Sequence, residues 1–430
     1  MKKLLPVIFL LGICFCLQAA DVKEFQINGL KVIFKTSPKE VISVRLFVLG
    51  GTANYPKEKE GIEALAFKVA LEGGTLNLSK TAFHTEAEKM GLRLSSSSTY
   101  DYGTLSMTCV RMFWDESWNL FTDAVMHPAF EENAFNLIRD QLVSAAKMAE
   151  SDPDNHLRNL AMQSVFKGKN YAKIPDGSPA TLQALSLNEA MEYYRFVLGK
   201  QRCFLVVVGN IREDDLVSKI ETTLARLPEG QPVAWEQPLR FTRPAVYMEA
   251  RDIATNYIRG LMNAPHISTK EGIAMQVAMS IVQDRFFVEL RTKRSLSYAP
   301  SAFYATGVIH NPYSVIYIST QQPVQSVTVM TDIISTLRRQ GFTQKDIQHK
   351  RQSFLTHYYL EQETSSAQSL SLGMAEIAGS YNLAETLTDR VNALTLTDLN
   401  EAFRKHTNVI QWVYLGKPEA ITAKDFKQPE

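Results

Sequence analysis

Histidine is the side chain most often found at metal and proton-transfer sites, and this chain has eight. A zinc-binding helix needs two imidazoles at positions i and i+4, because those positions share one face. No two histidines are three or four residues apart; they stand at positions 84, 127, 156, 266, 310, 349, 357 and 406. His84 has Glu86 and Glu88 nearby, and His349 and His357 are two turns apart on a predicted helix. We interpret each as a surface histidine, and their spacing predicts no zinc site.

The sequence also lacks the patterns of other kinds of catalytic site. The sequence has no Gly-x-Ser-x-Gly nucleophile turn and no phosphate-binding glycine loop. Outside the first twenty residues only Cys109 and Cys203 remain, and neither has a local histidine. Both lie in apolar strand-like runs, so one disulfide and two buried thiols are both compatible with the sequence. The carboxylates are scattered, and no pair stands out.

Residues 1–20 have the pattern of an export signal. Lys2 and Lys3 precede an apolar run from Leu4 to Leu17, and the small residues Ala19 and Ala20 follow. Such a run is short for a permanent membrane span. We predict a signal peptide cleaved near Ala20 and an exported, periplasmic or secreted protein. An uncleaved N-terminal anchor is the alternative.

The composition of the chain excludes some other classes of protein. The 430 residues carry 46 Lys+Arg against 45 Asp+Glu, so no basic excess exists to neutralise nucleic-acid phosphates. A hydrophobic content of 45% and a charged content of 21% are ordinary for a packed globular protein. The length predicts two or three domains.

The chain contains an internal duplication. Lys59-Glu60-Gly61-Ile62 recurs 211 positions later, at residues 270–273. Phe130 is echoed by Phe342, and the strand ending at Gly209 by the strand ending at Gly416. Three echoes in one order at nearly one offset predict two similar halves. We place these halves at residues 21–226 and 245–430, joined by a linker at 227–244 that contains four prolines.

Each half groups its strands and its helices. Residues 25–35 and 41–50 are predicted strands, and residues 92–100 and 103–110 form a predicted hairpin about Asp101 and Tyr102. Between them the apolar residues 62, 65, 66 and 69 fit a helix. Strands grouped without regular alternation predict an α+β fold with a mostly antiparallel sheet in each half.

Several segments together resemble the insulinase-like (pitrilysin) family of zinc peptidases, the inverzincins. Gly61-Ile62 opening a helix that ends Glu72-Gly73-Gly74-Thr75 is similar to the family's Gly-[Ile/Leu]-x-His-x-x-Glu-His helix. Residues 177–211 resemble the close of the family's N-terminal domain. Residues 290–298, Leu-Arg-Thr-Lys-Arg-Ser-Leu-Ser-Tyr, match its Leu-Arg-x-x-x-x-Leu-x-Tyr segment and are the most specific match. The resemblance covers the mature chain and implies two homologous halves that form one half of a clamshell.

The resemblance also shows what is missing. Counted from Gly61, the two metal-binding histidines fall on Ala64 and Lys68, and the general-base glutamate falls on Phe67. A register shifted by one residue gives Leu65 and Val69 instead, with Lys68 at the base position. The third ligand position is Ala145. None of these residues can supply a zinc ligand or a base, so we expect no metal or other cofactor in this chain.

The Arg and Tyr of the matching segment are retained as Arg291 and Tyr298. The resemblance implies that they reach across a cavity to peptide bound at a partner's zinc site. A Tyr hydroxyl suits an oxyanion, and an Arg fork suits a peptide carbonyl or carboxylate. The plain alternative is a surface salt-bridge Arg and a core Tyr.

Two functions follow from the resemblance. The first is a zinc-less subunit of an exported peptidase, similar to the non-catalytic partners in two-chain bacterial members and in mitochondrial processing peptidase. It would pair with a zinc-bearing relative and act on peptide or unfolded polypeptide. The alternative is an inactive peptide-binding or scaffold protein of the same fold. A peptidase with a relocated metal site is disfavoured by the histidine spacing.

Overall fold

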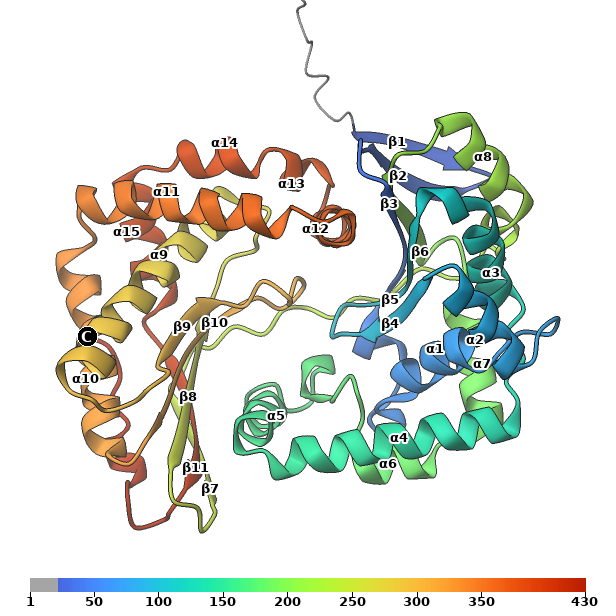
Figure 1. The fold of residues 1–430 in the computed structure, drawn as a ribbon. Coiled ribbons are helices and arrows are strands. Elements are labelled where there is room, and N and C mark those ends of the chain that lie inside the picture. The colour runs from blue at the N-terminus through green and yellow to red at the C-terminus, as the bar shows by residue number, and fades with distance from the viewer. Residues whose placement is uncertain (1–21) are drawn as a thin grey trace, which may run out of the picture.

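Two mixed β-sheets, each packed with helices, make up the α+β fold of the computed structural model, which describes residues 22–430 (Figure 1). The predicted signal peptide lies outside these residues. Within the described part of the chain, no helix is both long and apolar enough to cross a membrane.

The first sheet has six strands in the order β1-β2-β6-β3-β5-β4. Their bounds are β1 Val22–Ile27, β2 Leu30–Thr36, β3 Val41–Leu49, β4 Arg93–Ser98, β5 Tyr102–Val110 and β6 Cys203–Gly209. All neighbours are antiparallel except β2 and β6, which run parallel. The strand predicted at residues 25–35 is wrong as a single element. Asn28 and Gly29 have φ values of 47° and 87°, which suits a tight hairpin turn between β1 and β2.

The second sheet repeats this topology. Its five strands follow the order β7-β11-β8-β10-β9, and only β7 and β11 are parallel. They are β7 Ala245–Ala250, β8 Asn256–Asn263, β9 Ser301–Tyr304, β10 Tyr313–Thr320 and β11 Ile410–Gly416. Gly209 ends β6 and Gly416 ends β11, so the echoed glycines occupy equivalent places. The predicted duplication is therefore present in three dimensions.

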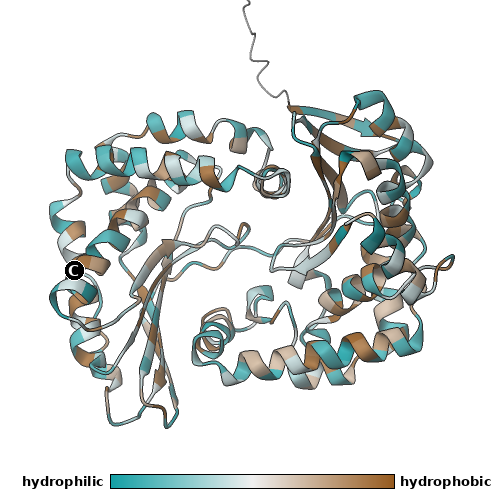
Figure 2. Cartoon of the chain, viewed as in Figure 1, coloured by the Kyte–Doolittle hydropathy of each residue, from teal (hydrophilic) through white to brown (hydrophobic). Residues whose placement is uncertain are grey.

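One face of each sheet is covered by helices of its own half. On the first sheet α1 (Ile62–Glu72), α3 (Trp114–Met126) and α7 (Leu187–Val197) bury the main core. On the second, α9 (Lys270–Phe286), α10 (Pro323–Gln340) and α15 (Leu396–His406) do the same. Apart from α5 and α12, the other α-helices are α2 Lys80–Lys89, α4 Glu132–Ser151, α6 Pro179–Ala184, α8 Glu213–Thr222, α11 Gln344–Glu361, α13 Asn382–Glu385 and α14 Leu387–Asn392. Apolar residues gather on the strands and on the inner helix faces (Figure 2).

The other face of each sheet is covered by a helix from the opposite half. Helix α5 (Pro153–Val165) packs on the second sheet, where Leu157 is fully buried beside Leu261 and Val413. Helix α12 (Ser365–Ile377) packs on the first sheet, where Gly373 lies against the Phe47 ring (Figure 1). A Cβ at Gly373 would come within 2.0 Å of that ring, so only glycine permits this approach. The two halves therefore exchange helices.

A buried carboxylate fixes the junction between the halves. Asp101, fully buried in the β4–β5 turn, accepts hydrogen bonds from the Tyr171 hydroxyl at 2.6 and 2.7 Å. It also accepts a hydrogen bond from the Ile309 backbone N–H in the second half, at 2.6 Å. Residues 227–244 contain no helix or strand, and Trp235 among them stacks on His310 with 3.5 Å between ring centroids.

Cys109 and Cys203 are both buried and unbonded to each other. Burial raises the pKa of the Cys109 thiol to about 11, which leaves it protonated and unreactive at neutral pH. Of the two possibilities that the sequence left open, the structure has the buried thiols.

Candidate functional site

Helix α1 turns one face to the sheet and leaves its neighbouring face half-open. Glu63 and Phe67, one turn apart, lie over Gly103 of β5, where a Cβ would come within 2.6 Å of the Glu63 Oε1 and 2.5 Å of the Phe67 ring. Ala64 and Lys68 follow on the half-exposed face. Leu65 and Val69, the ligand positions of the alternative register, are fully buried. Of the two registers, only the one with Ala64 and Lys68 at the ligand positions therefore places both of these positions on a partly exposed face.

These positions do not fit a metal. Phe67, at the general-base position, is fully buried, and its ring packs edge-on against Tyr194. Lys68 forms an ion pair with Glu72 at 2.8 Å on the half-exposed face. Across residues 22–430, no group of three or more His, Cys, Asp and Glu side chains lies close enough to hold a metal ion. His84, the nearest histidine in sequence, has its Nε2 3.0 Å from the Glu72 carbonyl oxygen.

The third ligand position borders a cavity. Ala145 on α4 lines a cavity of about 700 Å³ between the two halves. Ser98, at the end of β4, lies on the same wall. Small residues of α4 (Ala145, Ala146 and Ala149) leave room here where a long acidic side chain would project.

Glu63 is a buried titratable group one residue before Ala64, and the sequence analysis missed it. Its Oε1 accepts a hydrogen bond from Ser98 Oγ at 2.9 Å, and its Oε2 accepts one from the Tyr193 hydroxyl at 2.6 Å. Burial raises the pKa of the carboxyl to about 7, against the opposing effect of these hydrogen bonds. A glutamate on the otherwise apolar face of a predicted helix was the available signal, but its partners are distant in sequence.

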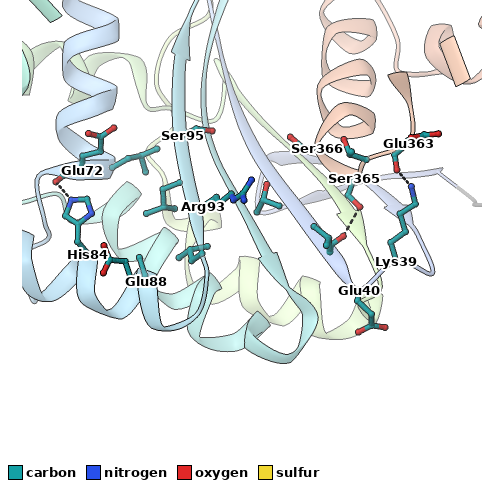
Figure 3. A pocket seen from close by; sticks show the side chains of 17 residues that line it. Lys39, Glu40, Glu72, His84, Glu88, Arg93, Ser95, Glu363, Ser365 and Ser366 are labelled. Atoms are coloured by element: carbon teal, nitrogen blue, oxygen red, sulfur yellow. Dashed lines mark hydrogen bonds between the residues drawn. The ribbon is translucent and has the colours of Figure 1, made fainter. Parts of the chain in front are cut away.

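Strand β4 is one of the two edge strands of the first sheet, and β1 is the other. Its side chains alternate between exposed and half-buried, as expected for an edge. Beside its first residues is a groove of about 890 Å³, shown in Figure 3. The groove runs between the end of α1 and the start of α12, and its charged lining includes Glu40, Glu72, Glu88, Glu363, Lys39 and Arg93.

The Arg291 and Tyr298 side chains stack on each other outside the core. Helix α9 continues into a π-helix at Phe287–Lys293, and its end places the Arg291 guanidinium 4.1 Å from the Tyr298 ring centroid and 4.8 Å from the Phe287 centroid. Tyr298 is 80% exposed. The plain alternative of a core Tyr is therefore excluded. Arg291 makes no ion pair within residues 22–430. The structure does not bring Arg291 and Tyr298 to the α1 site of their own chain: neither lines the cavity or the groove.

Comparison with known proteins identifies the family. Residues 31–174 match the insulinase (peptidase family M16) model, and residues 184–354 match the model of the peptidase M16 inactive domain. The chain belongs to peptidase family M16. The fold is likewise that of two M16 domains.

The similarity to curated relatives and to solved structures extends over most of the chain. A Helicobacter pylori protein named a non-peptidase homolog is 22% identical over 95% of this chain and 96% of its own. A Bacillus subtilis protein named an uncharacterized zinc protease is 19% identical over 88% of this chain and 93% of its own.

Among solved structures, an M16 inactive domain from Pseudomonas fluorescens superposes with a TM-score of 0.82 at 18% identity, over 94% of this chain and 100% of that one. The periplasmic protease PqqL from Escherichia coli gives 0.78 at 15% identity, over 97% of this chain and 49% of its own. The M16 fold is thus shared with both.

Proposed function

We propose that this M16 chain is a zinc-less subunit of an exported peptidase, which pairs with a zinc-bearing relative and completes that relative's site. The observation that carries the proposal is the contrast between two segments. The α1 helix keeps its half-exposed face but holds Ala64 and Lys68 there, whereas Tyr298 is held out in solvent. An aromatic ring of this size is normally buried in part, so its exposure is consistent with a role toward another molecule.

In this proposal the Tyr298 hydroxyl donates a hydrogen bond to the oxyanion that develops on the peptide carbonyl in the partner's site. Arg291, planar and stacked against the Tyr298 and Phe287 rings, holds a peptide carbonyl or carboxylate through its fork of N–H groups. The stacking limits the freedom of both side chains, which favours a preformed arrangement.

The decisive experiment uses the purified complex. The chain is co-expressed with an M16 relative that has an intact His-x-x-Glu-His helix, and size-exclusion chromatography reports the complex. We expect peptide hydrolysis by the complex and none by this chain alone. Tyr298→Phe should lower turnover about 100- to 1,000-fold without changing complex size, and Tyr359→Phe, at a tyrosine 59% exposed on α11, is the matched control.

Failure to associate with any such relative would reject the subunit proposal. Full activity of the Tyr298→Phe complex would remove the assigned role of that hydroxyl.

The open β4 edge and its groove favour a second candidate, an inactive peptide-binding or scaffold protein. An edge strand can pair with an extended peptide through backbone hydrogen bonds, and no partner chain is needed for that. Peptide binding by the isolated chain, without any complex or hydrolysis, would support this function over the first.

A further inference from the structure

The cavity between the halves is walled mostly by apolar and aromatic side chains. The first half contributes Tyr100, Leu142 and the small residues of α4, and the second contributes Phe303, Val308 and Tyr313. The end of β4 opens into the cavity at Ser98 and Thr99. A chain paired with the β4 edge would therefore have one end at the cavity.

Two arginines beside this cavity form no ion pair within residues 22–430. Arg259 on β8 is half-buried, and its Nε is buried without a hydrogen-bond partner. Its guanidinium carbon lies 5.9 Å from the centroid of Phe303, a wall residue. Arg158 of α5 lines the cavity itself. Burial, together with the charge of Arg158, lowers the pKa of Arg259.

Two phenol hydroxyls complete a set of donors. The Tyr100 hydroxyl has no hydrogen-bond partner among the described residues, and the Tyr313 hydroxyl faces Arg259, which can only donate. Both tyrosines line the cavity. Burial raises the pKa of each phenol, so both keep their hydrogens at neutral pH. The set therefore offers two guanidiniums and two phenol O–H donors to a ligand.

The acidic residues nearby form no ion pair with Arg259 or Arg158 within residues 22–430. Asp101 accepts from Tyr171 and Ile309, and Asp154 accepts from Tyr317. Asp176 and Glu150 also line the cavity, and neither forms an ion pair with Arg158 among the described residues. Burial raises the pKa of the Asp176 carboxyl, and the charge of Arg158 opposes this shift, so Asp176 offsets part of the charge of Arg158 only while it is ionised. The charge of Glu150 at the exposed rim is screened by water and salt, whereas the guanidinium of Arg259, which is partly buried in the wall, is screened much less.

We propose that this cavity binds the free C-terminal carboxylate of a peptide whose last side chain is apolar or aromatic. A carboxylate would accept from the two guanidiniums and the two phenols, which suits the fork geometry of arginine. It would also supply the counter-charge that a buried guanidinium otherwise lacks. The aromatic and aliphatic walls would take the terminal side chain. The inference rests on the proposed function only in taking a peptide as the ligand.

The test compares two probes on the isolated chain. Fluorescently labelled Ala-Ala-Ala-Ala-Phe is prepared with a free C-terminal carboxylate and with a C-terminal amide, and binding is measured by anisotropy. We expect the free acid to bind about 10-fold or more tightly than the amide, the worth of hydrogen bonds to a charged group. Arg259→Gln and Arg158→Gln should each bring this ratio close to one. Arg212→Gln, whose side chain is 83% exposed on the surface, should leave the ratio unchanged.

Thermal unfolding gives a second readout that does not depend on the peptide. Without ligand, Arg259→Gln should unfold at the same or a higher temperature, because an uncompensated buried cation has been removed. The acid peptide should raise the unfolding temperature of the wild-type chain and leave that of Arg259→Gln unmoved. Arg158 is exposed on α5, so Arg158→Gln should fold normally. It therefore tests the proposal even if Arg259→Gln misfolds.

Equal binding of the acid and amide peptides by the wild-type chain would overturn the proposal. So would a preference for the acid that survives both arginine changes. If acetate or phosphate binds while the two peptides bind equally, the site belongs to a small free anion and the peptide assignment is wrong. The acid preference with no hydrolysis by any complex would support this site and reject only the subunit proposal.

Discussion

Replacing Glu63 by Gln should change how the stability of this protein depends on pH. The Glu63 carboxyl is fully buried between α1, β4 and α7, and it accepts hydrogen bonds from Ser98 and Tyr193. Gln keeps nearly the same shape and its carbonyl oxygen can accept from Tyr193. The substitution therefore removes the titration of this group with little change in packing.

The magnitude follows from the pKa. Burial raises the pKa of Glu63 from the ordinary 4.5 to about 7 in the folded protein. The folded state therefore holds this proton between pH 4.5 and about 7, where the unfolded chain has released it, and stability falls as pH rises through that window. At about 1.36 kcal/mol per pH unit, the full effect is about 3 kcal/mol. It is absent below pH 4.5 and complete by about pH 8.

The assay is urea unfolding of the wild type and Glu63→Gln at intervals from pH 4.5 to 8. The difference between their free energies of unfolding cancels every other titrating group. We expect it to move by about 3 kcal/mol in favour of the variant as pH rises. Glu192→Gln, an exposed glutamate beside Tyr193 on α7, is the control and should show a constant difference. A difference for Glu63→Gln that stays constant across the range would refute the reasoning, because it would mean that burial does not hold the proton.

Three further outcomes are expected. The dialysed chain should contain no stoichiometric zinc by metal analysis, and one tightly held zinc per chain would revive a relocated site. In the complex, Arg291→Ala should weaken peptide binding, and Arg291→Lys should not restore it, since an ammonium cannot make the bidentate contact. Steady-state kinetics should show this as a raised KM with little change in kcat. A KM for the Arg291→Lys complex equal to that of the wild type would contradict the prediction. Gly373→Ala should lower the free energy of unfolding by about 1–3 kcal/mol, because the new methyl group would overpack against Phe47. Gly307→Ala, with no atom within 4 Å of the new Cβ, should be neutral in urea unfolding.

The duplication and the α+β class were predictable because they rest on repeated local patterns. The echo of Gly209 at Gly416 fell at the ends of equivalent central strands, β6 and β11. The hairpin at Asn28 and Gly29 was predictable too, since Asn-Gly is a strong turn signal, but the apolar run through it suggested one strand. Apolar periodicity indicates that a segment is a strand, but the ends of the strand are predicted only when the turn residues are taken into account.

The sequence predicted only those features of the site that depend on residues close together in the chain. Spacing along α1 identified Ala64 and Lys68 as candidates but could not choose the register, because burial of Leu65 and Val69 depends on how the helix sits on the sheet. The partners of Glu63 come from β4 and α7, and the counter-charge of Arg259 is missing only because of what surrounds it in space. No sequence pattern encodes such distant neighbours.

The exchange of α5 and α12 has a consequence for how this protein could be divided. Each sheet has one face finished by a helix that the other half encodes, so either half made alone would leave rows of aliphatic and aromatic residues open to water. We therefore expect separate expression of residues 22–226 and 245–430 to give insoluble material, and co-expression to restore one soluble particle. A protease cut within residues 227–244 should likewise leave both fragments together. The two halves are then held together by the packing of the exchanged helices, and the linker at residues 227–244 is not needed to keep them associated.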